Sequence, residues 1–311
     1  MEIYDLKEIP EEYKKYFQKV EIGLEKTWQE YIGKLMDVFN EVKRVLKKDG
    51  TCFVNLGDSY GTQSGASMGR IYNSEKTYLT NRGNGDVLLK PKDKDWHKSL
   101  MLIPHRFAIT MIDNNWRLRN TLIWVKPNAM PESVQDRWKK AHEYIFFFTK
   151  NKNYYFNLDA IRTPHKLVSI ERAEYEQGRN ALGQNLSSMG EKYNKDKNNK
   201  DGTEKYYSMP ARMVKLNPKG SVPPDYFLVN TNCSENDGSN EHYATYPQNL
   251  IMPLIRAGSK EGDIILDPFM GSGTTAVVAK KLKRNFIGIE ISPKYINIAT
   301  QRLKLIQQSL L

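Results

Sequence analysis

The first part of the chain alternates between apolar residues at helical spacing and short continuous apolar runs. Over residues 28–47 apolar side chains recur at steps of three and four, which predicts an amphipathic helix with one buried stripe. Gly50 follows this helix, and the apolar run after it predicts a buried strand over residues 52–56. Helical spacing returns over residues 100–114, where we expect a second amphipathic helix.

Two further apolar runs, residues 117–125 and 144–149, predict neighbouring strands. The polar segment 126–141 joins them without a helical pattern, so we expect an antiparallel pair that closes one edge of a largely parallel sheet. Residues 61–98 are rich in Gly, Ser, Asn and Lys and predict a long loop, which in a compact domain is usually functional or mobile.

The C-terminal part shows a strand, a glycine-rich turn, a helix and a second strand. An apolar run from Ile264 ends in Asp267, and the turn that follows leads into a predicted helix over residues 274–282. The next strand, predicted over residues 285–291, contains Glu290. Glycines let the backbone approach a ligand, a helix N-terminus offers free N–H groups, and an acid about twenty residues further on suits ribose hydroxyls. The pattern predicts a nucleoside pocket.

Three kinds of ligand suit such a pocket to different degrees. A triphosphate P-loop needs a Lys-Ser/Thr pair after its last glycine, whereas Thr274 and Thr275 follow Gly273 here. Gly271, Gly273 and Ala276 satisfy the looser dinucleotide fingerprint, but an Asp-Pro-Phe preface separates the strand from the turn. A tight turn without any ligand is a further interpretation.

The string Asp-Pro-Phe-Met-Gly-Ser-Gly-Thr-Thr at residues 267–275 closely resembles the S-adenosylmethionine motif of the DNA amino-methyltransferases. This resemblance favours S-adenosylmethionine, the third kind of ligand, for the pocket. The resemblance covers most of residues 20–160 and 240–305. Segments of the catalytic half come first and the cofactor pocket comes last, an order similar to the beta class, which methylates an exocyclic amino group of cytosine or adenine. Other segments that resemble the family are residues 21–27, 41–50, 55–60, 123–131 and 242–247.

The resemblance implies an α/β fold, the Rossmann-like S-adenosylmethionine-dependent methyltransferase fold. We therefore expect a mostly parallel sheet with helices on both faces, a permuted motif order and an inserted target-recognition region. The implied domains are a catalytic half over residues 1–164, the target-recognition region over residues 165–235 and a cofactor-binding half over residues 236–311.

The resemblance also implies which residues bind the cofactor. Glu290 is expected on the ribose, and His242 is expected beside the methionine end, although a packing role for this histidine is equally open. The glycine turn and its preface are expected around the methionine part, through Asp267, Phe269, Gly271, Ser272, Gly273 and Thr274.

For the target base, the expected residues are Asp58, Lys126 and Asn128. Asp58 either lines the target pocket or forms a turn after its strand. Lys126 either takes part in the chemistry or meets a DNA phosphate.

The family's catalytic loop, Ser/Asp/Asn-Pro-Pro-Tyr/Phe, has no recognisable match, so the catalytic residues are unknown. Its polar group and carbonyl accept hydrogen bonds from the amino group, whose lone pair is delocalised into the ring, and its aromatic residue stacks on the flipped base. Residues 7–13 occupy the corresponding region without fitting it. Pro223-Pro224 lies downstream with the wrong spacing, and we interpret it as a decoy. Either the sequence begins late, or the enzyme is impaired or split.

Composition favours a polyanionic partner, because 47 basic residues against 36 acidic ones leave a formal net charge of +11. Cations on duplex DNA release counterions, so we expect double-stranded DNA as the partner, with salt-dependent affinity. No apolar run is long enough for a membrane helix and no signal peptide is apparent, which predicts a cytoplasmic protein without a membrane partner. Cys52 and Cys233 lack the spacing of a zinc site, so no metal is expected.

Residues 165–220 carry an excess of basic residues, several tyrosines and a Lys/Asn-rich run. The two interpretations are a solvated insertion and a region that reads DNA, with cations on phosphates and polar side chains on base edges. Its position between the two halves matches the target-recognition region of the beta class, and we favour recognition.

The sequence thus predicts a site-specific DNA methyltransferase of a restriction-modification system, with a genetically linked endonuclease that need not bind it. Cytosine N4 is favoured over adenine N6, because the Gly-Leu-Glu and Asn-Leu-Gly-Asp-Ser-Tyr strings resemble cytosine-N4 members more closely. A protein that holds DNA and cofactor without turnover is a second hypothesis. An RNA or protein methyltransferase is disfavoured by the permuted order.

Overall fold

The computed structural model describes residues 22, 23, 25, 27–61, 98–181, 216–231 and 246–309. The chain divides into two units, of which the first comprises Met1–Asn157 with Asp225–Leu311 and the second comprises Leu158–Pro224. The predicted loop over residues 61–98, the run Lys192 to Lys200 and His242 fall almost wholly outside the described residues. No helix in the described ranges is long and apolar enough to cross a membrane.

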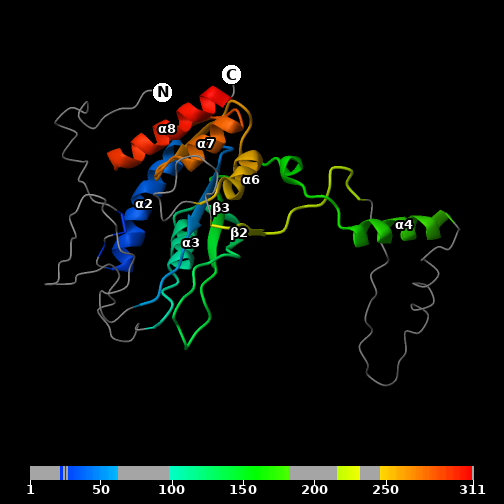
Figure 1. The fold of residues 1–311 in the computed structure, drawn as a ribbon, viewed down its shortest axis with the longest axis horizontal. Coiled ribbons are helices and arrows are strands. Elements are labelled where there is room, and N and C mark those ends of the chain that lie inside the picture. Colours follow the sequence, from blue (N-terminus) through cyan, green and yellow to red (C-terminus); the bar gives the residue numbers. More distant parts are fainter. Residues whose placement is uncertain are drawn as a thin grey trace. The chain divides into compact units, whose positions relative to one another are not determined.

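A four-stranded sheet with the order β1-β3-β2-β4 forms the centre of the first unit (Figure 1). Strand β3 runs antiparallel to both of its neighbours, whereas β2 and β4 are parallel. The predicted antiparallel pair β2–β3 is therefore confirmed, but it does not close an edge. Strand β1 covers one side of β3, and the short β4 pairs with the outer side of β2. The strands are β1 (Thr51–Leu56), β2 (Arg117–Val125), β3 (His142–Thr149) and β4 (Tyr226–Leu228).

Helices cover both faces of this sheet because successive side chains of a strand point to opposite sides. Helices α2 (Trp28–Val45) and α3 (Ile103–Asp113) pack against Phe146 and Phe148 of β3 on one face. Helix α6 (Gln248–Gly258) packs against Ile145 of β3 on the other face. The predicted α/β architecture with helices on both faces is confirmed.

Strand β2 changes faces in its middle. Leu118 belongs to the apolar cluster with α2 and α3, whereas Leu122 and Trp124 belong to the cluster with α6. The register against β3 shifts between Leu118 and Asn120. Such a bulge inserts one residue and moves all later side chains to the opposite face. The bulge therefore directs Trp124 toward α6.

The predicted strand–helix–strand unit near the C-terminus is present. Strands β5 (Ile264–Asp267) and β6 (Asn285–Gly288) are parallel and are joined through helix α7 (Thr274–Lys281). Helix α8 (Pro293–Ser309) packs beside α7 (Figure 1), where Val277 and Leu303 form a small core. Strand β6 ends before Glu290, which lies in the segment that leads into α8.

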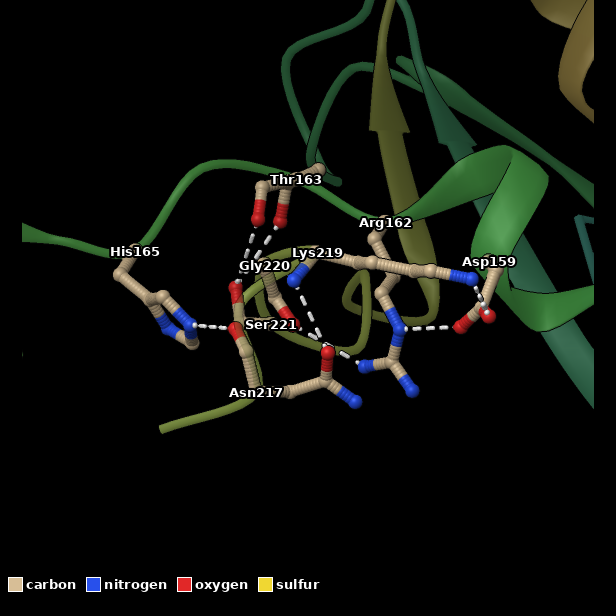
Figure 2. Close-up of polar contacts among 8 residues, drawn as sticks. All are labelled: Asp159, Arg162, Thr163, His165, Asn217, Lys219, Gly220 and Ser221. Atoms are coloured by element: carbon tan, nitrogen blue, oxygen red, sulfur yellow. Dashed lines mark hydrogen bonds and ion pairs between the residues drawn. The ribbon is translucent and has the colours of Figure 1, made fainter. Parts of the chain in front are cut away.

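The second unit holds most of the described residues of the predicted insertion 165–235, whereas Tyr226–Leu228 within that range form β4 of the first unit. It contains a 3₁₀ turn at Leu158–Ile161 and helix α4 (Leu167–Ala181). Thr163 and Ser221 pair through their backbones, with N···O distances of 3.1 and 2.8 Å. Figure 2 shows that Arg162 and Lys219 both reach Asp159, each at 2.7 Å. These contacts join the two ends of the insertion at its base.

Candidate active site

Two glycines shape the turn between β5 and α7. Gly271 has φ of 53° and Gly273 has φ of 83°, a left-handed conformation that suits glycine. A Cβ on Gly273 would lie 2.7 Å from the Cβ of Ala299, so this glycine lets α7 approach α8 closely. A Cβ on Gly271 would meet nothing within 4 Å. The backbone at Gly271 therefore borders open space, as the predicted approach of a ligand requires.

Asp267 stands at the carboxyl end of β5 and organises the start of the turn. Its Oδ1 accepts a hydrogen bond from the Phe269 amide at 3.0 Å, and its Oδ2 accepts one from Thr275 Oγ1 at 2.5 Å. The Tyr246 hydroxyl donates to the same Oδ2 at 3.2 Å. Burial, and then the charge of Asp267, raise the pKa of Tyr246 above its ordinary value, so the phenol stays a donor.

Glu290 bridges the end of β6 and the glycine turn. Its Oε2 accepts a hydrogen bond from the Gly271 amide, and its Oε1 accepts one from the Ser292 amide, both at 2.8 Å. The carboxylate is thus fixed beside the open backbone of Gly271. Its predicted role on a ribose stays a prediction, but its position next to the turn fits that role.

The side chains of Ser272 and Thr274 face the interior. Arg302 of α8, whose residue is 3% exposed, donates to the Ser272 carbonyl at 2.8 Å. Its Nη1 also lies 3.1 Å from Ser272 Oγ and 3.2 Å from Thr274 Oγ1. The hydroxyls of both residues therefore stabilise the turn from its buried side. Because these hydroxyls are engaged, only the backbone groups of Ser272 and Thr274 remain for the predicted contact with a cofactor, which stays a prediction.

Phe269 lies on the outer side of the same turn and is 47% exposed. The predicted role of Phe269 beside the methionine part of the cofactor stays a prediction, and the exposed ring is accessible for such a contact. His242, the remaining predicted cofactor residue, lies outside the described residues.

The residues predicted for the target base gather at one edge of the four-stranded sheet. Strands β1 and β2 both run antiparallel to β3, so their carboxyl ends meet at the same edge. Asp58 follows β1, while Lys126 and Asn128 follow β2. Ligands of open α/β sheets bind beyond the carboxyl ends of strands.

Asp58 is 7% exposed and caps helix α3 from a distance. Its Oδ1 accepts hydrogen bonds from the amides of Ile103 at 3.0 Å and Ser59 at 2.8 Å. This replaces the missing side-chain cap of α3, which begins after Leu102 with φ of 55°. These contacts agree with the interpretation of Asp58 as a turn-forming residue.

Lys126 and Asn128 are both held by neighbours. Lys126 forms an ion pair with Glu143 of β3, and its ammonium lies 4.3 Å from the centre of the Trp124 ring. Asn128 Oδ1 accepts a hydrogen bond from the Thr231 amide at 2.9 Å. Glu143 was not predictable as a site residue, because it is distant from Lys126 in sequence and no local spacing indicates the pair.

The two halves of the first unit are joined at the amino ends of their strands. Lys47, just before β1, forms an ion pair of 2.9 Å with Asp263, just before β5. Thr51 Oγ1 donates to the Gly258 carbonyl at 3.1 Å. Strands β1 and β5 therefore begin at the same end of the unit. Among the described strands, β1 pairs with β3 and β5 pairs with β6.

A glycine turn with two carboxylates near strand ends is typical of α/β proteins that bind nucleosides. Comparisons with known proteins assign the family. The family described as DNA methylase matches residues 4–301, so the chain belongs to the N6/N4 DNA methylase family. Type II methyltransferase M.XycI of Xanthomonas campestris pv. cyanopsidis is 33% identical over 284 residues, which are 91% of this chain and 75% of the relative. Type II methyltransferase M.Cfr9I of Citrobacter freundii is 32% identical over the same length and shares.

A solved structure supports the same fold. The PvuII DNA methyltransferase, titled cytosine-N4-specific, superposes with a TM-score of 0.56 at 18% identity. The match covers 92% of this chain and 74% of that protein. The predicted methyltransferase fold is confirmed.

Proposed function

We propose that this protein transfers a methyl group from S-adenosylmethionine to an exocyclic amino group in double-stranded DNA, with cytosine N4 as the favoured position and adenine N6 as the alternative. The observation that carries the proposal is the open backbone at Gly271, which the carboxylate of Glu290 contacts at 2.8 Å. Its position after Asp267 at the carboxyl end of β5 is where this fold class binds nucleosides.

The residues at this turn fit the cofactor. Gly271 leaves room where a side chain would intrude, and the Glu290 carboxylate is a strong acceptor for ribose hydroxyls. The carboxylate of Asp267 suits the ammonium of a methionine part. When bound, the cofactor supplies an electrophilic methyl group. Arg302 contributes rigidity, because it fixes Ser272 and Thr274 beneath the turn.

The substrate side is proposed at the edge with Asp58, Lys126 and Asn128. A base that is modified on its amino nitrogen must leave the duplex before the nitrogen can meet the methyl group. Cytosine N4 is supported by the family segments of the sequence and by the cytosine-N4-specific title of the superposed protein. The Type II names of the relatives support a role in restriction-modification.

The segment over residues 165–235 is proposed to read the DNA sequence. The residues just before this segment are joined to residues 219–221 within it by the pairing of Thr163 with Ser221 and by the contacts of Asp159. An insertion whose two chain segments are paired in this way can contact DNA as one unit.

The cofactor assignment is tested by Glu290→Ala. Loss of charged hydrogen bonds to the ribose should weaken S-adenosylmethionine binding by roughly 1.5–3 kcal/mol, measured by titration calorimetry. Glu261→Ala, which removes an exposed carboxylate before β5, is the matched control and should bind as the parent does. Equal affinity of the Glu290 variant and the parent, or binding of NAD in place of S-adenosylmethionine, would refute the pocket.

The target base is identified separately. Duplex DNA methylated by the protein is digested to nucleosides and analysed by mass spectrometry. Detection of N4-methylcytosine would support cytosine N4 as the methylated position. Detection of N6-methyladenine would instead identify adenine N6.

A further inference from the structure

We propose that the loop between β2 and β3, residues 126–141, holds Trp138 as an apolar wedge that enters the DNA duplex beside the displaced base. This inference rests on the proposed function, because it requires a DNA substrate whose target base leaves the helix. It adds a contact on the DNA stack itself, apart from the cofactor turn and the insertion.

The side chain of Trp138 is unusually exposed to solvent. Its exposed fraction is 93%, and that of Met130 in the same loop is 84%, the two highest values among the large hydrophobic residues that the structure describes. Tryptophan is highly buried on average in folded proteins, since its large apolar surface is costly to leave in water. An exposed apolar group on a defined loop therefore indicates a surface that a partner covers.

The loop that carries Trp138 is held in place by its own contacts. Arg137 forms an ion pair of 2.7 Å with Glu132, and its guanidinium lies 4.0 Å from the centre of the Tyr60 ring. Lys139 Nζ donates to the Ala129 carbonyl at 3.2 Å. The backbone on both sides of Trp138 is thus fixed while the indole points away. A side chain on a fixed backbone loses less conformational entropy on binding than one on a loop that must first be ordered.

The loop is also anchored to the proposed substrate edge. Lys140 donates to the carbonyl of Asp58, and the amide of Lys126 donates to the Ala141 carbonyl at 2.8 Å. Lys98 forms an ion pair of 2.5 Å with Asp136. Trp138 therefore projects from the edge at which Asp58 and Lys126 lie, where a displaced base is expected.

The charges around Trp138 fit DNA. Arg137, Lys139 and Lys140 flank it in the order Arg-Trp-Lys-Lys, and the whole chain carries a formal net charge of +11. Cations position a protein on phosphates, while an apolar side chain inserted between base steps unstacks them. A wedge of this kind fills the space that a displaced base leaves and so favours the displaced state.

The test measures binding to two duplexes of one sequence, of which one is intact and the other contains a single abasic site. The abasic duplex offers a preformed gap, so the parent protein should bind it more tightly, as followed by fluorescence anisotropy. Trp138→Ala should lose about 5- to 150-fold in affinity for the abasic duplex, the range found for aromatic stacking on bases, and Trp138→Phe should retain most of it.

Salt dependence separates the wedge from simple charge attraction. Trp138→Ala should leave the log–log slope of affinity against salt unchanged, whereas Lys139→Ala should reduce it by about 0.9 if that ammonium meets one phosphate. Ile109→Ala, a change at an exposed apolar residue of α3, is the control for lost apolar surface and should match the parent. All variants should melt at the parent temperature, because the side chains of Trp138, Lys139 and Ile109 are all exposed.

The wedge is overturned if Trp138→Ala and the parent show the same preference for the abasic duplex. It is also overturned if Trp138→Ala lowers self-association in sedimentation without changing DNA binding, since a second copy would then cover this loop. Failure of the proposed function has a different signature, in which the parent itself binds neither duplex nor S-adenosylmethionine.

Discussion

At the scale of single residues, the glycine turn that we propose binds the cofactor is held by the buried cation of Arg302. Arg302 comes from α8 and contacts the backbone or hydroxyl groups of Ser272 and Thr274 from a nearly fully buried position. A buried guanidinium keeps its charge and needs acceptors, and the turn supplies them. The residue therefore couples the packing of α8 to the shape of the glycine turn.

Replacing Arg302 by methionine tests this coupling. Methionine keeps the apolar stem but removes the donors, so the Ser272 carbonyl loses its partner. We expect the free energy of unfolding to fall by roughly 1.5–3 kcal/mol and S-adenosylmethionine binding to weaken, as measured by urea unfolding and calorimetry. Arg256→Met, at an exposed position of α6, is the control. Parental stability of the Arg302 variant would show that the turn holds its shape without the arginine.

Asp263 provides a residue-level test by pH. The Lys260 amide, which donates at 2.8 Å, and then Lys47 hold the pKa of this carboxyl below its usual value of 3.8. A carboxyl with a lowered folded-state pKa stabilises the protein above its unfolded-state pKa and loses this stabilisation as the pH falls through the folded-state pKa.

We therefore expect Asp263→Asn to lower the free energy of unfolding at pH 7 by roughly 0.5–1 kcal/mol. The difference from the parent should shrink below about pH 4. Chemical unfolding at a series of pH values measures this, with Asp37→Asn, a change at an exposed carboxylate of α2, as the control for lost charge. A difference that stays constant down to pH 2 would contradict the role of the ionised carboxyl.

At the scale of elements, the glycine turn sets the distance between α7 and α8. Gly273 and Gly262 both have positive φ, at 83° and 81°, but only Gly273 has a close neighbour at the place of a Cβ, Ala299 at 2.7 Å. The two positions therefore separate backbone strain from packing between helices.

Alanine at each position should reveal this difference. Gly262→Ala should lose about 1–2 kcal/mol of stability, the cost of the left-handed conformation alone. Gly273→Ala should lose about 1–3 kcal/mol more, because the new methyl group pushes α7 from α8. Urea unfolding of both variants compares them. Equal losses would mean that the two helices can separate without cost.

Elements with strong periodicity were predictable from sequence, and others were not. Helix α2, strand β2 and the β5–α7–β6 unit follow from apolar spacing and from turn residues. Helix α6 contains Pro253 in its interior, so local propensity argues against it, and the packing of its buried face on the sheet compensates. The position of β3 between β1 and β2 depends on long-range pairing, which spacing does not encode.

The site shows the same division. The motif around Asp267 and Glu290 was visible because its residues are close in sequence. Arg302 and Lys140 reach the site from other elements, and a single basic residue in a helix or loop carries no signal of its partner. The clustering of Asp58, Lys126 and Asn128 at one edge follows from the strand directions, which only the sheet topology supplies.

At the scale of the whole molecule, the strands that the structure describes form two sheets. Strand β1 has β3 on one side, and β5 has β6 on one side, while no described strand pairs with their other sides. The ion pair between Lys47 and Asp263 places the starts of both strands at one end. Free strand edges offer backbone groups to a further strand. A strand that paired there in parallel would end at the same end of the sheets as β1 and β5, where Asp58 and Asp267 lie.

The final prediction concerns catalysis by the chain of 311 residues. Its sequence contains a complete cofactor turn, but its one adjacent proline pair, Pro223-Pro224, lies in the second unit. We therefore expect S-adenosylmethionine binding with slow transfer to duplex DNA. A segment that combines an apolar strand with Ser-Pro-Pro-Tyr, supplied in front of the chain or as a separate peptide, should raise the transfer rate by about 10²–10³, the effect of a preorganised group at the reacting centre.

Transfer of a tritiated methyl group measures this rate. A segment with alanine in place of serine and tyrosine is the matched control, because it keeps the strand but removes the acceptor and the stacking ring that the amino group and base require. Cofactor affinity should be the same with either segment, since Asp267 and Glu290 remain unchanged. Fast transfer by the chain alone would show that residues 1–20, or residues 55–60 with Asp58, accept the amino hydrogens in another form.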